Sequence, residues 1–194
     1  MSEAGLVRCD WVPFGDGADA ALYRAYHDTE WGHPLHGRAA MFERMSLEAF
    51  QSGLSWLTIL RKRDNFRAAF HGFDIETVAG FGAAEVDRLM ADAGIVRNRA
   101  KIDATIANAR VAADLDVDLD ELLWSFAPPP RPRPAAMSHV AAVTPESIAM
   151  ARELKRRGFR FVGPTTAYAL MQATGMVDDH VEACWVPRYS LSEA

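Results

Sequence analysis

Four residues near the two ends of the chain have the composition of a zinc site. The sequence contains two cysteines, Cys9 and Cys184; His27 follows the first, and His180 lies four positions before the second. Two thiolates and two imidazoles can form a closed tetrahedral zinc site, and residues four apart share one face of a helix. Because four protein ligands leave no open position for water, we expect one structural Zn²⁺ that joins segments 9–27 and 180–184.

Glu48 is the second residue that can do chemistry. It is the only acidic residue between Glu43 and Asp64, and it lies where the helical pattern is most apolar, before Gly53 interrupts the helix. Burial of an unpaired carboxylate costs several kcal/mol, roughly. Two interpretations therefore stay open from the pattern: Glu48 is a functional acid, or it lies on the exposed face of an otherwise buried helix.

A group of aromatic residues accompanies these candidates. Such side chains usually form protein cores. Here they gather in the sequence around Cys9 and His27, so a metal bound at that segment would also fix their positions. With a fifth aromatic residue from the Glu48 segment they can form a box: Trp11, Tyr23, Tyr26, Trp31 and Trp56.

Residues 87–102 are typical of two helices joined by a tight turn. We expect Gly94 to adopt a turn conformation that a side chain would resist, and the second helix to begin near Arg97 or Asn98. The free N–H groups and the positive dipole at such a helix end bind phosphate. Three basic residues lie beside it: Arg97, Arg99 and Lys101. The segment resembles the helix-hairpin-helix element of DNA repair enzymes, with Ala100 near the position of that motif's second glycine, but most glycine-turn hairpins bind nothing.

The rest of the sequence predicts an all-α fold. Apolar residues recur at intervals of three and four almost throughout, as in Met41, Phe42 and Met45, and runs of alternating β-branched residues are missing. Helix caps are visible as well, since Asp74 precedes a short predicted helix. Other predicted helix ends are Thr144–Pro145, Gly158, Pro164 and Gly175.

The proline-rich stretch 128–134 interrupts this pattern. Adjacent prolines are excluded from helix interiors, so we expect an extended surface connector with polyproline character. A linker is a better interpretation than a partner-binding motif. With 194 residues and no internal repeat, we expect residues 1–194 to form a single helical domain, with two lobes allowed.

Composition and charge bound the class of protein. Hydrophobic residues make up 49%, which is typical of a globular protein, and no segment reaches the ~18 uncharged apolar residues of a membrane span. The N-terminus lacks the apolar region of a signal peptide, and two cysteines without export indicate a reducing cytoplasm. The net charge of −5 disfavours a non-specific nucleic-acid binder. Basic clusters at 61–63, 97–101 and 155–160 still allow a local positive face, although solvated helix ends explain each one singly.

Five sequence blocks together resemble the DNA-3-methyladenine glycosylase I family, bacterial base-excision repair enzymes of the helix-hairpin-helix superfamily. The blocks keep their order and spacing from Arg8 to Trp185, which makes them far more specific than any single motif. They are Arg8–Trp11, Tyr23–Gly32, Leu47–Trp56, Gly158–Gly163 and Asp179–Cys184. The resemblance implies an all-α glycosylase fold. It also implies a monofunctional enzyme that hydrolyses the N-glycosidic bond of flipped-out 3-methyladenine in alkylated double-stranded DNA and leaves an abasic site.

The resemblance also implies roles for individual residues. Glu48 is similar to the acid that hydrogen-bonds the alkylated base, and the 92–102 hairpin is similar to the element that grips DNA. The rings on which the base stacks are Tyr26 and Trp56, with Tyr23, Trp11 and Trp31 nearby. The structural zinc ligands are Cys9, His27, His180 and Cys184. We expect a monomer in the bacterial cytoplasm, without membrane contact.

Two rival functions remain open from the sequence. A zinc-dependent hydrolase would need three protein ligands and an open position on the metal, with Glu48 activating the metal-bound water. A DNA-binding module without catalysis would make Glu48 merely structural. Metal titration and substitution of Glu48 separate these alternatives.

Overall fold

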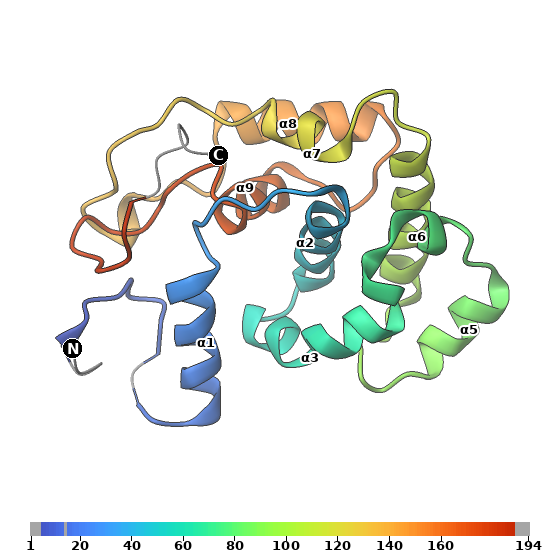
Figure 1. Ribbon diagram of the computed structural model, residues 1–194, viewed down its shortest axis with the longest axis horizontal. Helices are drawn as coiled ribbons and strands as arrows, with labels where there is room; N and C mark the ends of the chain where they lie inside the picture. Colours follow the sequence, from blue (N-terminus) through green and yellow to red (C-terminus); the bar gives the residue numbers. More distant parts are fainter. Residues whose placement is uncertain (1–4, 14, 189–194) are drawn as a thin grey trace.

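The computed structural model describes residues 5–13 and 15–188, and its regular structure is helical (Figure 1). No strand occurs within these residues, so the all-α prediction is confirmed. The α-helices are α1 (Ala18–Thr29), α2 (Arg38–Gln51), α3 (Trp56–Ala69), α4 (Ile75–Ala79), α5 (Ala83–Ala91), α6 (Arg99–Ala113), α7 (Leu119–Trp124), α8 (Pro145–Arg156) and α9 (Pro164–Ala173). Short 3-10 turns are η2 (His71–Phe73) and η3 (Met137–His139). None of the helices in this part of the chain has the length and apolarity needed to cross a membrane.

Several helices begin and end where the sequence marks them. The Asp74 side chain accepts a hydrogen bond of 2.9 Å from a backbone amide in the first turn of α4. Thr144 caps α8 in the same way. Past the other ends of α8 and α9, Gly158 and Gly175 have φ angles of 101° and 72°, a left-handed conformation that glycine adopts without strain.

Helix α2 is the central element of the molecule. It packs against α3, α6, α7 and α9, and Figure 1 shows it near the middle of the fold. Its predicted apolar residues are buried, among them Met41, Phe42 and Met45. Two charged side chains of the same helix are buried with them, because Arg44 is only 6% exposed and Glu48 only 5%. Charged residues are rarely buried without a partner or a function, so this helix directs attention to the cavity beside it.

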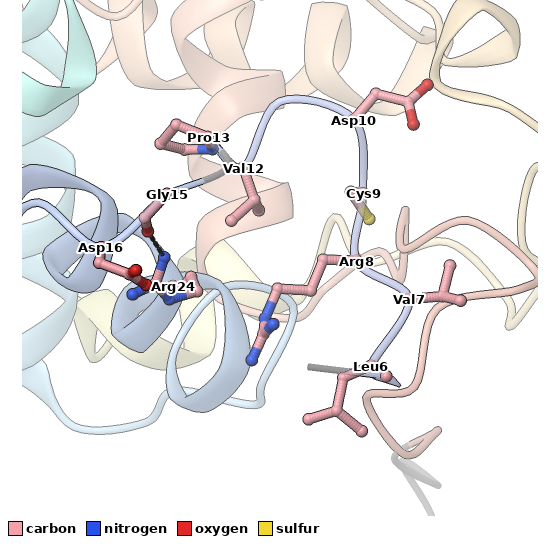
Figure 2. A pocket seen from close by; sticks show the side chains of 11 residues that line it. Leu6, Val7, Arg8, Cys9, Asp10, Val12, Pro13, Gly15, Asp16 and Arg24 are labelled. Carbon is pink, nitrogen blue, oxygen red and sulfur yellow. Dashed lines mark hydrogen bonds between the residues drawn. The ribbon is translucent and has the colours of Figure 1, made fainter. Parts of the chain in front are cut away.

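The first and last described segments lie side by side next to α1 (Figure 1). The Trp185 amide donates a hydrogen bond of 2.9 Å to the Val7 carbonyl oxygen. Figure 2 shows the N-terminal segment at close range, where Arg24 of α1 donates to the Gly15 carbonyl oxygen. The first and last described segments are therefore in contact, as the positions of the two cysteines predicted.

The proline-rich stretch 128–134 lies outside any helix, as predicted, but it does more than connect α7 to α8. Arg133 is 8% exposed, which differs from the expected surface connector. Its guanidinium donates hydrogen bonds of 2.8 Å to the Asp178 carboxylate and 2.8 Å to the Val186 carbonyl oxygen. The connector therefore holds the C-terminal segment in place.

Candidate functional site: a metal cluster beside an aromatic cavity

The four predicted ligands meet in one buried cluster. Their ligand atoms all lie within 4.8 Å of one another. The Cys184 Sγ lies 3.6 Å from the His27 Nε2 and 3.4 Å from the His180 Nδ1. The Cys9 Sγ lies 3.7 Å from the same His180 nitrogen. Sulfur and nitrogen ligands of a tetrahedral zinc ion lie roughly 3.5 Å apart, so this cluster can hold a metal ion of that kind.

The outer nitrogens of both histidines are held by hydrogen bonds. The His27 Nδ1 lies 2.7 Å from the Asp28 Oδ1, and the His180 Nε2 lies 2.9 Å from the Trp31 carbonyl oxygen. These oxygens accept the ring N–H, so the nitrogen that faces the cluster keeps its lone pair for a metal. Arg8 holds Asp28 in turn, with 2.6 Å between Nη2 and Oδ2. The cluster therefore has the ligands and the supporting hydrogen bonds of a closed metal site.

The predicted aromatic residues and Glu48 line one cavity of about 270 Å³. Its walls come from the N-terminal segment, α1, α2, α3, η3 and α9, so the fold brings together segments that are far apart in the sequence. The lining residues are Trp11, Tyr23, Tyr26, Trp31, Glu48, Gln51, Trp56, Met137, Ala169 and Gln172. A cavity of this size with aromatic walls and few polar groups suits one planar ring system.

The cysteine–histidine cluster and the cavity lie side by side. The centroid of the Trp11 ring lies 5.2 Å from that of His27 and 5.1 Å from that of Trp31, in edge-to-face contacts. The Trp31 carbonyl oxygen holds His180, while the Trp31 ring lines the cavity. Residues of the cluster therefore contact the rings of the cavity directly.

Glu48 is buried in this cavity, and no hydrogen bond joins its carboxylate to another described residue. Burial raises the pKa of Glu48 to about 7, against the attraction of the Arg44 guanidinium. The alternative that Glu48 lies on an exposed helix face is thereby excluded. An unpaired buried carboxylate destabilises the fold, and residues whose pKa is perturbed in this way cluster at functional sites.

Arg44 is the charged neighbour of Glu48 on the same helix. Its guanidinium lies 5.4 Å from the centroid of the Tyr26 ring and 6.0 Å from that of the Trp56 ring. It also donates a hydrogen bond of 3.2 Å to the Glu30 carboxylate. Because Arg44 is shared in this way, it orients the two rings and leaves Glu48 only partly compensated. Burial also raises the pKa of Tyr26, so its hydroxyl stays neutral at physiological pH.

The predicted hairpin is formed by α5 and α6. Helix α6 begins at Arg99 after the capping residue Asn98, close to the predicted position. The turn conformation that a side chain would resist is not observed at Gly94, whose φ lies outside the left-handed region. A Cβ there would lie 2.8 Å from the Asp92 Oδ1 and 3.1 Å from side-chain atoms of Asn65, so a larger residue would require these side chains to move.

The three basic residues of the hairpin have different surroundings. Arg97 and Arg99 are exposed. Lys101 is only 7% exposed, and its Nζ donates hydrogen bonds to the carbonyl oxygens of Phe50 at 2.8 Å and Ser52 at 2.5 Å. The expectation that Lys101 faces phosphate is therefore wrong. Its ammonium instead neutralises the carbonyl end of α2, and burial lowers its pKa.

A second hollow, of about 710 Å³, lies under the N-terminal segment and is the one drawn in Figure 2. The arginines that line it are already engaged: Arg8 pairs with Asp28, and Arg24 donates to the Gly15 carbonyl oxygen. Its other walls are mostly aliphatic side chains and backbone. It lacks a buried group comparable to Glu48, so the aromatic cavity is the better candidate for a functional site.

Comparison with known proteins agrees with this geometry. A profile of the methyladenine glycosylase family matches residues 17–187. The chain belongs to this family. It is 43% identical over 184 residues to DNA-3-methyladenine glycosylase 1 of Escherichia coli K12, covering 92% of this chain and 96% of that protein. It is 39% identical, over the same shares of the two chains, to DNA-3-methyladenine glycosylase of Haemophilus influenzae Rd.

Solved structures of methyladenine glycosylases have the same fold. A crystal structure of 3-methyladenine DNA glycosylase I has a TM-score of 0.86 and 42% identity, over 92% of this chain and 98% of that chain. The enzyme from Staphylococcus aureus, described in terms of its recognition of 3-methyladenine, has a TM-score of 0.83 and 33% identity, over 87% and 93% of the two chains.

Some residues of this methyladenine glycosylase site do not stand out in the sequence. Arg44 and Gln172 are examples. For Arg44 a signal does exist, because it precedes Glu48 by four residues and therefore lies next to it on the same helix face. Asp28 directly follows His27 of the cluster and lies 2.7 Å from its Nδ1. An acid beside a metal-binding histidine is a known arrangement, and it could have indicated the hydrogen bonds around the cluster.

Proposed function

We propose that this methyladenine glycosylase hydrolyses the N-glycosidic bond of flipped-out 3-methyladenine in alkylated double-stranded DNA, releasing the base and leaving an abasic site. The observation that carries the proposal is the buried carboxylate of Glu48, unpaired in an aromatic cavity the size of one base. An unpaired acid in an aromatic cavity is suited to a flat cation. Methylation at N3 turns adenine into such a cation.

The chemistry follows from the charge of the damaged base. N3-methylation weakens the glycosidic bond, because the base then leaves the sugar as a neutral molecule. Aromatic faces such as those of Tyr26 and Trp56 attract a cation by about 2 kcal/mol or more once water is excluded. An ionised Glu48 attracts the same charge and accepts a hydrogen bond from the exocyclic amine. Neutral adenine gains neither electrostatic contribution and is rejected.

Removal of the base by water, without strand cleavage, fits the residues present. Cleavage through a covalent intermediate needs an amine nucleophile at the sugar. No lysine is among the described residues that line the cavity. Lys101 is held by the carbonyl oxygens of Phe50 and Ser52 and is not free to attack. We therefore propose a monofunctional enzyme.

DNA would be held by the hairpin and by the turn after α2. The base must leave the helix to reach the cavity, at a cost of a few kcal/mol, roughly. Arg97 and Arg99 are exposed at the start of α6, where phosphates are attracted by the helix end, in the manner of a helix-hairpin-helix element. Leu54 is 41% exposed on the turn between α2 and α3, after Gly53. An exposed apolar side chain there can fill the gap that a flipped base leaves.

We also propose that the cluster binds one Zn²⁺ with a structural role. The donor set is two sulfurs and two imidazole nitrogens, both imidazoles are oriented by hydrogen bonds, and all four residues are buried. Such an ion would tie the N-terminal segment to the C-terminal segment and leave no position for water. The donors would therefore stabilise the walls of the cavity and take no direct part in base removal.

The broader setting of the protein completes the proposal. We propose that the enzyme acts as a monomer. We propose one domain and a bacterial cytoplasmic location, where DNA and reduced cysteines occur together.

The test is release of methylated bases from alkylated duplex DNA, with chromatography to identify the product. We expect free 3-methyladenine and intact strands that break only when alkali cleaves the abasic site. Borohydride should trap no enzyme–DNA adduct. Absence of 3-methyladenine among the products would contradict the proposed reaction, and a trapped adduct would contradict the monofunctional mechanism.

A further inference from the structure

Gln172 is a polar residue of the cavity without a role in the proposed reaction. It lies on α9 and lines the same cavity as Glu48 and the aromatic rings. Its Nε2 donates a hydrogen bond of 2.9 Å to the Oδ2 of Asp179. One end of the Gln172 amide is therefore anchored outside the cavity.

Asp179 is a buried acceptor whose other contacts all come from donors. It is 1% exposed. The Tyr168 hydroxyl donates to it at 2.6 Å, and the Arg131 guanidinium donates at 2.7 Å. Arg131 also donates to the Tyr168 oxygen at 2.6 Å, which turns the Tyr168 hydrogen toward the carboxylate. An ionised carboxylate only accepts hydrogen bonds, so the Gln172 amide must present its NH₂ group to Asp179.

The orientation of the amide determines what the cavity offers to a ligand. With Nε2 bound to Asp179, the Gln172 Oε1 is left without a partner among the described residues, and it is not among the buried polar atoms that lack one. The oxygen is therefore accessible from the cavity that the side chain lines. Together with Glu48 of α2, it gives the cavity hydrogen-bond acceptors from two different helices.

We propose that Gln172 determines specificity for a 6-amino purine over a 6-oxo purine, and that Asp179 is the residue that positions it. This inference rests on the proposed function. The exocyclic amine of adenine has two N–H donors, one for Glu48 and one for the Gln172 oxygen. Guanine has a carbonyl oxygen at the same position. That oxygen would face acceptors, and a site built for hydrogen-bond donors rejects such a ligand because its polar atoms stay unpaired.

The experiment compares two products from one sample. DNA treated with a methylating agent contains both 3-methyladenine and 3-methylguanine, so one chromatogram gives the release rate of each base. Gln172→Met keeps the size of the side chain and removes the acceptor. We expect kcat/KM for 3-methyladenine to fall about tenfold, whereas kcat/KM for 3-methylguanine should change little. The 3-methyladenine to 3-methylguanine ratio of kcat/KM should therefore fall about tenfold.

A second variant tests the positioning role without replacing a residue that lines the cavity. Asp179→Asn can donate to the Gln172 oxygen, which turns the amide so that its NH₂ faces the ligand. We expect the 3-methyladenine to 3-methylguanine ratio to fall here as well, with metal content and thermal unfolding as checks of the fold. Tyr168→Phe is the matched control: it removes another hydrogen bond of Asp179, and the ratio should stay near that of the wild type.

The outcomes separate this inference from the proposed function. Wild-type protein that releases neither base contradicts the proposed function and this inference with it. Wild-type release of 3-methyladenine with an unchanged ratio in Gln172→Met overturns this inference alone. A falling ratio in both Gln172→Met and Asp179→Asn, and a constant one in Tyr168→Phe, supports it.

Discussion

The cysteine–histidine cluster and the aromatic cavity both include residues of α1, yet the hydrogen bonding of their polar groups differs. Around the cluster, the outer nitrogen of each histidine has an acceptor, and the acceptor Asp28 is itself held by Arg8. In the cavity, the Glu48 carboxylate has no hydrogen bond to a described residue and the Trp56 Nε1 has none either. The first region is closed, and the second is open to a ligand.

This difference indicates which region does the chemistry. A closed site with every donor oriented stabilises the fold but has no position left for a substrate. An open site that keeps an unpaired acid is costly to the fold, and it is retained where a ligand supplies the missing partner. This difference disfavours both rival functions. A zinc hydrolase needs a metal with an open coordination position, and a DNA-binding module without catalysis does not explain a buried, unpaired Glu48.

The largest expected effect is the loss of a cluster ligand. Cys184→Ala should lower the metal content and the midpoint of thermal unfolding by at least about 10 °C, because metal binding in such a site contributes to the free energy of folding. Calorimetry with metal analysis measures both. A variant that folds normally and keeps its metal, yet has no activity, would favour a catalytic ion and break the comparison.

Glu48→Gln should change activity and stability in opposite directions. We expect kcat/KM for 3-methyladenine release to fall about 10²- to 10³-fold, as for loss of one electrostatic group in an active site. The raised pKa means that the folded state keeps a proton between pH 4.5 and about 7 that the unfolded state releases. Wild-type stability therefore falls as the pH rises through this window, and Glu48→Gln should be more stable by roughly 3 kcal/mol at pH 8 and unchanged near pH 4.

Glu43→Gln is the matched control on the same helix. Glu43 pairs with Arg67 at 3.0 Å and does not line the cavity. Its replacement should leave activity near that of the wild type and change stability by less than about 1 kcal/mol. If the two glutamine variants behaved alike in denaturant titrations and in base release, Glu48 would have no special role.

The pH dependence of the reaction gives a sharper test of the open cavity. If ionised Glu48 holds the cationic base, kcat/KM should rise about tenfold per pH unit below about 7 and then level off, since kcat/KM reports the free enzyme. Glu48→Gln should remove this inflection. An inflection that persists in Glu48→Gln belongs to a different group.

A smaller effect is expected at Lys101, where the structure and the sequence disagree. Lys101→Met should destabilise the fold by about 1–3 kcal/mol, because two carbonyl oxygens of α2 lose a charged donor. Lys101→Met should leave the salt dependence of DNA binding unchanged. Arg99→Met should reduce the slope of log K for DNA binding against log salt concentration by about the amount expected for one phosphate contact. If Lys101→Met reduced this slope as much as Arg99→Met, Lys101 would contact phosphate after all.

The sequence predicts the cluster better than the rest of the site, for a physical reason. Cysteine and histidine have few roles at such spacing, so Cys9, His27, His180 and Cys184 can be recognised by type alone. The all-α class and the helix ends follow from periodicity and from caps such as Asp74, which are local signals.

What the sequence does not predict depends on contacts between distant segments. Periodicity cannot tell whether Lys101 faces solvent or the end of α2, because the two lie about fifty positions apart. The Arg131 and Asp179 pair joins a proline-rich connector to the C-terminal segment and cannot be inferred from either alone. The sequence places the turn at Gly94 correctly but does not give the reason for the glycine. The proximity of Gly94 to Asn65, a residue about thirty positions away, cannot be inferred from the local sequence.

We assign stability to the closed cluster and the reaction to the open cavity. The most direct test of this division is the rate of 3-methyladenine release after metal exchange. Protein reconstituted with Co²⁺ in place of Zn²⁺ should keep kcat/KM within about twofold, because four protein ligands leave the metal out of the reaction. Glu48→Gln should lower the rate by the same factor in both forms. A rate that changes roughly tenfold or more with the metal would place the chemistry at the cluster and contradict this account.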